Sequence, residues 1–68
     1  MPYLTNADLP ASVRDHLPHY AQDIYREAFN HAWGQYAADS RREEIAHRVA
    51  WAAVEKAYTK LGAEWVRR

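Results

Sequence analysis

Between residues 18 and 36, apolar side chains recur at steps of three and four, the spacing of one face of an α-helix. This face comprises Ala21, Ile24, Tyr25, Ala28, Phe29, Ala32, Trp33 and Tyr36. A second stripe of the same period follows, made of Ala46, Val49, Ala50, Ala53, Ala57 and Leu61 and widened by Ile45, Val54 and Tyr58. Because the connection between the stretches is short, the sequence predicts two long antiparallel helices, with the small residues of one facing the aromatic residues of the other.

Proline marks the expected helix boundaries in the first part of the chain. Pro10 lies where a helix can begin, since its missing N–H costs nothing in the first turn. A short helix over 11–16 is expected to end before Pro18, which disfavours helical backbone at the residue before it. Pro18 also opens the first long helix in the same way that Pro10 opens the short one.

The second long helix is expected to begin near Arg41 and to end at Lys60 or Leu61. Ser40 followed by Glu43 fits the capping-box pattern, in which each side chain binds the backbone N–H of the other residue. Gly62 is the residue type that commonly terminates a helix. These signals predict a helix over residues 41–61.

Trp65 is a large apolar side chain outside both stripes, and we expect it to fold back on the core. A short two-stranded ribbon with Tyr3 and Leu4 is one way to do so. The predicted fold is therefore an all-α, compact single domain over residues 1–68. It has a short N-terminal helix, a long antiparallel helical hairpin and, as a minor feature, a terminal β-ribbon.

The core of so short a chain must come from aromatic residues. The 68 residues include three tryptophans, five tyrosines and one phenylalanine but no cysteine, which excludes a disulfide or a thiolate metal site. Trp33 and Trp51 are expected to belong to this core. The lack of cysteine favours a reducing compartment, and no apolar run reaches the length of a membrane span or a signal peptide. A cytoplasmic location without direct membrane insertion is expected.

Nothing in the pattern points to catalysis, a metal or another cofactor. The four histidines, His16, His19, His31 and His47, do not share a helical face at metal-binding spacing. Glu43 and Glu44 are neighbours on a helix and point in different directions, so they do not form a catalytic pair. With two glycines the chain also lacks a phosphate-binding loop. The sequence therefore predicts a non-enzymatic binding module.

Three basic residues cluster at the start of the second long helix: Arg41, Arg42 and Arg48. A helix-turn-helix protein places such residues on its recognition helix, so a nucleic-acid-binding module is an alternative function. The chain as a whole has no basic excess, with nine basic and nine acidic residues. An ordinary solvated face with ion pairs also explains the cluster.

The order of motifs resembles the ChaB family of small bacterial proteins, also found in some insect viruses. The resemblance rests on Asp8-Leu9-Pro10, Leu17-Pro18, Ile24-Tyr25, Glu27-Ala28-Phe29-Asn30, Ala32-Trp33, Arg42-Glu43-Glu44, Ala46-His47 and Val49-Ala50-Trp51-Ala52-Ala53-Val54. It covers nearly the whole chain and implies a compact, mostly helical fold. It also implies a regulator of a cation/proton antiporter, which would be its protein partner. The chain departs from the family pattern in its shorter connection between the long helices and its shorter segment before Trp65.

The resemblance brings out polar residues that match the family pattern: Glu27, Asn30, Arg42 and His47. Together with Arg41 and Arg48 they are the candidate partner surface. Each could instead have a structural role, in which Asn30 or His47 ties the helices to the N-terminal segment. The leading prediction is a regulatory module that docks on the cytosolic face of a transporter, the alternative is nucleic-acid binding, and a purely structural partner is a third possibility.

Overall fold

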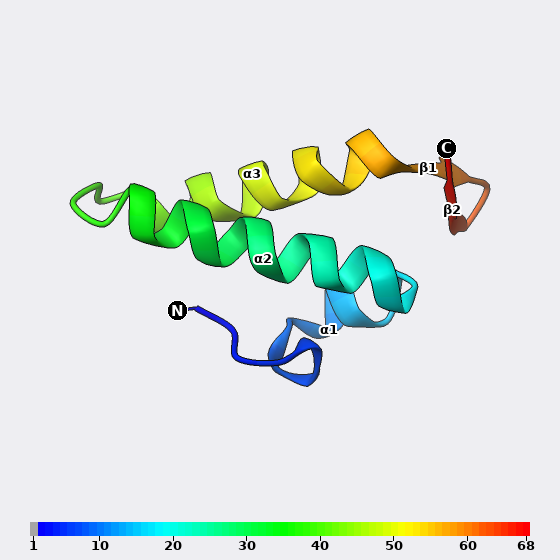
Figure 1. The fold of residues 1–68 in the computed structure, drawn as a ribbon, viewed down its shortest axis with the longest axis horizontal. Helices are drawn as coiled ribbons and strands as arrows, with labels where there is room; N and C mark the ends of the chain where they lie inside the picture. The colour runs from blue at the N-terminus through cyan, green and yellow to red at the C-terminus, as the bar shows by residue number, and fades with distance from the viewer. Residues whose placement is uncertain (1) are drawn as a thin grey trace.

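The computed structural model describes residues 2–68. Its elements are a 3₁₀ turn η1 (Asn6–Asp8), helices α1 (Ala11–Arg14), α2 (His19–Gln35) and α3 (Arg42–Ala57), and strands β1 (Tyr58–Leu61) and β2 (Glu64–Arg67). Helices α2 and α3 run antiparallel, side by side, and the N-terminal segment with α1 lies along α2 (Figure 1). The β-hairpin continues beyond α3, at the end of the molecule where α2 begins. The mostly helical fold predicted from the two stripes is confirmed.

α2 begins directly after Pro18, which has an extended backbone and lies just outside the helix, not in its first turn as predicted. α3 begins at Arg42, close to the predicted start, but the predicted cap is wrong. Ser40 does not cap α3: the residue before the helix is Arg41, and no side chain caps it. Asp39 orders this connection instead, because its Oδ1 accepts the Arg41 backbone N–H at 2.7 Å. An aspartate two residues back can form this turn, and it competes with the serine cap.

The predicted end of α3 is also wrong, since the helix stops at Ala57 and the chain continues as β1. Gly62 does not terminate a helix but lies in the two-residue turn of the hairpin, with a φ of 65° that favours glycine. The ribbon does involve Trp65, but its partner is Lys60 of β1 and not the N-terminal segment. β1 is near in sequence and contains Tyr58 and Thr59, residue types that favour strands.

The core lies between α2 and α3 and is closed by the N-terminal segment. α2 contributes its largest members, Tyr25 and Phe29, both fully buried. Other buried residues are Leu9, Val13, Leu17, Ala21, Ala32, Ala46, Ala50, Val54 and Tyr58. α3 and β1 bury four residues that recur at steps of four: Ala46, Ala50, Val54 and Tyr58. The buried face is therefore narrower than the predicted stripe. Val49 and Leu61 lie outside this buried face and are exposed, while Trp33 and Trp51 are half-buried at the edge of the core.

Candidate functional site

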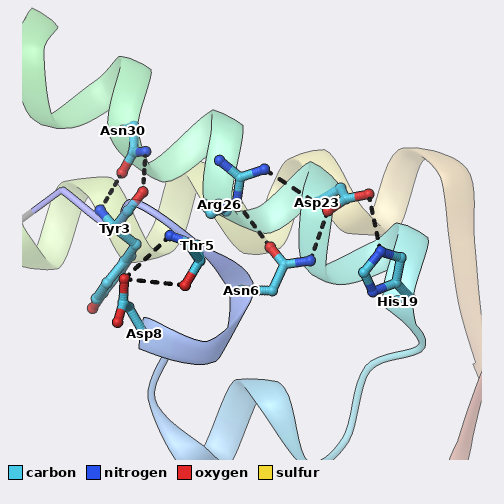
Figure 2. Close-up of polar contacts among 8 residues, drawn as sticks. All are labelled: Tyr3, Thr5, Asn6, Asp8, His19, Asp23, Arg26 and Asn30. Atoms are coloured by element: carbon cyan, nitrogen blue, oxygen red, sulfur yellow. Dashed lines mark hydrogen bonds and ion pairs between the residues drawn. The ribbon is translucent and has the colours of Figure 1, made fainter.

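A polar row on α2 holds the N-terminal segment. His19, Asp23, Arg26 and Asn30 follow one another at steps of four, three and four along the helix, so they lie on one face (Figure 2). Asn6 fits between two of them: its Nδ2 donates to Asp23 Oδ1 at 2.6 Å, and its Oδ1 accepts from Arg26 Nε at 2.8 Å. The sequence reasoning missed the role of Asn6. The helical spacing of the polar residues on α2 was a signal that this face binds another segment.

Asn30 ties the same segment down nearer to its beginning. Its Oδ1 accepts the Tyr3 backbone N–H at 2.8 Å, and its Nδ2 donates to the Tyr3 carbonyl at 2.7 Å (Figure 2). This pair of bonds satisfies both main-chain groups of one residue, as a β-ladder would. Asn30 therefore ties α2 to the N-terminal segment, which is the structural role predicted for it.

Asn30→Ala is expected to lower the free energy of unfolding by about 1–2 kcal/mol, because it leaves two half-buried main-chain groups of Tyr3 without partners. Urea unfolding followed by circular dichroism measures the change. Gln35→Ala, an exposed position on the same helix, is the control and should change stability by less than about 0.5 kcal/mol. Equal stability of the two variants would contradict the anchoring role.

His47 also faces inward, where its Nδ1 lies within hydrogen-bond distance of the Tyr25 hydroxyl. Burial, and to a lesser extent the neighbouring Tyr3, raises the pKa of Tyr25 to about 12. The hydroxyl therefore keeps its proton at neutral pH and can donate it to the unprotonated ring nitrogen. Burial lowers the pKa of His47, and the negative charge of Glu43 partly opposes this effect. His47 thus joins α2 to α3 within the molecule.

Stability is expected to decrease as the pH falls below 6.5, the ordinary pKa of histidine. The pKa of His47 is lower in the folded protein, so the unfolded chain binds the proton more readily. The His47 contribution is therefore complete above pH 6.5 and is lost as the pH falls toward the pKa of the folded protein. Urea unfolding at several pH values measures this. His47→Gln should remove that part of the pH dependence, and exposed His31→Gln should not; the reverse result would contradict it.

Arg42, the first residue of α3, connects this helix to the end of α2. Its Nε donates to the Trp33 carbonyl near the end of α2 at 2.7 Å. Its guanidinium carbon lies 3.9 Å from the centre of the Trp33 ring, a cation–π contact. Arg42 therefore supports the turn between α2 and α3.

The other two arginines of the basic cluster are exposed and share one carboxylate. Arg41 Nη2 lies 2.7 Å and Arg48 Nη2 lies 3.1 Å from Oε2 of Glu44. The hydrogen bond and the charge of Arg41 lower the pKa of Glu44, so this carboxylate stays ionised. The cluster therefore does not present three unpaired positive charges to a phosphate backbone. Glu27, the sixth candidate, is exposed on α2.

A groove that the sequence reasoning missed separates the β-hairpin from the α1–α2 connection. Asp15–Pro18 form one wall and Ala63–Val66 form the other, around a volume of about 390 Å³. The groove exists because the helix ends at Ala57 and residues 58–67 form a hairpin, whereas the sequence predicted a helix up to residue 61. Its lining includes two exposed carboxylates, Asp15 and Glu64, and no lysine or arginine.

Two further properties concern the part of the chain that the structure describes. Within residues 2–68, no group of three or more histidine, aspartate or glutamate side chains is arranged to hold a metal ion. None of the helices in this range is long and apolar enough to cross a membrane.

Known proteins are similar to this chain over most of its length. The ChaB family matches residues 9–68. Proteins of Escherichia coli strain K12 and of Shigella flexneri, each named "Putative cation transport regulator ChaB", are 58% identical over 66 residues, which cover 88% of this chain and 87% of theirs. A protein with a solution NMR structure, described as "the putative cation transport regulator ChaB", has a TM-score of 0.86 and 53% identity, covering 98% of this chain and 99% of its own. The fold, the motifs and these similarities agree: the chain belongs to the ChaB family.

Proposed function

We propose that this protein regulates a cation transporter by binding to it as a non-enzymatic module. The observation that carries the proposal is the 58% identity to relatives named as cation transport regulators, together with the family match over residues 9–68. The transporter is a cation/proton antiporter, and the protein meets its cytosolic face from the cytoplasm. The absence of cysteine supports this compartment.

A module of this size can regulate by binding one state of its target better than another. A transporter alternates between conformations, and a ligand shifts that equilibrium by as much as its affinities for the states differ. A difference of about 1–3 kcal/mol, typical of allosteric coupling, changes the equilibrium at least fivefold. No chemical step by the module is needed.

Three of the six candidate partner residues remain available for such an interface. Asn30, Arg42 and His47 already have partners within the molecule. Glu27, Arg41 and Arg48 are exposed, and the two arginine side chains pair with the exposed Glu44. We propose all three as polar contacts at the rim of the interface. Rim contacts of this kind affect the rate and salt dependence of association more than the affinity.

Everted membrane vesicles from host cells that lack the gene test the proposal. The rate of cation-induced proton release, after addition of Na⁺, K⁺ or Ca²⁺, is measured with a pH-sensitive dye, with and without purified protein. Saturable addition should change the rate for at least one cation by about twofold or more, and Arg41→Gln with Arg48→Gln should make the effect more resistant to salt. Identical rates for all three cations, with and without folded protein, would overturn the proposal.

A further inference from the structure

We propose that the groove between β2 and the α1–α2 connection binds an extended partner segment carrying lysine or arginine. The segment adds to the outer edge of β2 as a third strand. The inference rests on the proposed function only for the source of the segment, a cytoplasmic loop of the transporter. Its binding chemistry follows from the groove alone.

The register of the hairpin determines which main-chain groups of β2 point away from β1. The Arg68 N–H donates to the Ala57 carbonyl at 3.0 Å, so these two residues form a hydrogen-bonded pair. Pairs in an antiparallel ladder alternate, which makes Trp65 and Arg67 members of the pairs that do not bond to β1. Their N–H and C=O groups therefore point outward. No backbone bond joins them to another segment anywhere in residues 2–68.

The groove provides space for an added segment beside β2. The groove of about 390 Å³ runs between Ala63–Val66 of the hairpin and the wall formed by Asp15–Pro18. β2 has four residues, which at about 3.4 Å per residue gives roughly 13 Å of edge. Pro18, Trp65 and Val66 supply apolar surface for the side chains of an added strand, and the exposed edge supplies main-chain hydrogen bonds.

The charge of the groove selects a basic occupant. Asp15 and Glu64 are its acidic lining residues, and the lining includes no lysine or arginine. Asp15 has one exposed contact, with Arg14 at 3.6 Å, and Glu64 has no ion pair or hydrogen bond with another side chain of residues 2–68. A lysine placed opposite Glu64 on the added strand forms a favourable cross-strand pair. The cytoplasmic loops of membrane proteins are rich in lysine and arginine, which makes them suitable occupants.

A capped hexapeptide that alternates threonine with lysine is the probe, titrated into the ¹⁵N-labelled protein and followed by NMR. We expect shifts of the backbone amides of residues 15–17 and 63–67. The same peptide with glutamate in place of lysine, and one N-methylated at the threonines, should bind at least about fivefold more weakly, since one lacks the charge pair and the other the edge hydrogen bonds.

Two matched double variants separate the groove from general electrostatics. Asp15→Asn with Glu64→Gln should weaken lysine-peptide binding at least about fivefold. Glu43→Gln with Glu55→Gln removes the same total charge from exposed positions outside the groove and should leave binding unchanged. Equal binding of the lysine and glutamate peptides, amide shifts centred on another surface, or equal loss in both double variants would overturn the proposal.

The vesicle assay distinguishes a failure of this site from a failure of the proposed function. If the protein changes cation–proton exchange but the peptide does not bind the groove, the site is wrong and the regulatory function stands. If the lysine peptide binds the groove but exchange never responds to the protein, the transporter is the wrong source of the segment and the binding site stands. When both hold, Asp15→Asn with Glu64→Gln should remove the effect on exchange.

Discussion

Phe29→Ala is expected to unfold the protein or bring it close to unfolding. Phe29 is 0% exposed, and its ring centre lies 4.7 Å from that of Tyr3, 5.8 Å from Trp33 and 4.7 Å from His47. It therefore packs against α3 and the N-terminal segment as well as its own helix. Replacing a buried phenylalanine by alanine costs about 3–5 kcal/mol. A domain of this size has a total stability near the low end of the range, about 5 kcal/mol.

Circular dichroism at 222 nm, recorded against temperature and urea, measures this effect. Tyr20→Ala is the matched control because it removes an aromatic ring from the same helix at a position that is 68% exposed. The control should change stability by less than about 0.5 kcal/mol. A Phe29→Ala protein that melts as the control does would show that the centre of the core lies elsewhere.

Trp65→Ala is expected to separate the β-hairpin from the rest of the molecule while the helices remain. The Trp65 and Trp51 rings stack with their centres 5.8 Å apart, which ties β2 to α3. A two-stranded hairpin by itself is at best marginally stable in water, so it depends on such contacts. Because Trp65 is only half-buried, the expected cost is about 2 kcal/mol, below the range for a fully buried tryptophan.

Hydrogen exchange measured by NMR detects this local opening. The amides of Thr59, Leu61, Glu64 and Val66, which lie in the bonded pairs of the ladder, should exchange at least about tenfold faster in Trp65→Ala. Amides in the middle of α2 should change less. Leu61→Ala is the control within the same hairpin, since Leu61 is 69% exposed and should contribute little. Unchanged protection of the strand amides in Trp65→Ala would mean that the hairpin does not depend on this stack.

The candidate partner residues show that a match to the family pattern does not by itself identify a binding site. Asn30, Arg42 and His47 match the family pattern, and each is bonded to another segment of the same molecule. Their identities are explained by the need to join α2 to the N-terminal segment and to α3. The sequence does not tell whether a polar residue on a helix bonds within the molecule or to another protein. This depends on which groups the fold brings next to it.

The sequence by itself determined the helical hairpin, because the period of apolar residues is a local property of 18–36 and 41–57 and proline sets the start of α2. It also placed Tyr25 and Phe29 on the face of α2 that is buried, but an aromatic core was expected and most of the buried residues are aliphatic, while Tyr20 and Tyr36 are exposed. The tertiary structure alone decided that residues 58–61 form a strand and that a groove opens beside Glu64. In sequence, Tyr58–Leu61 continues the helical pattern as well as it fits a strand. What favours the strand is pairing with β2 and the contact of Trp65 with Trp51, interactions between residues that become neighbours only when the chain folds.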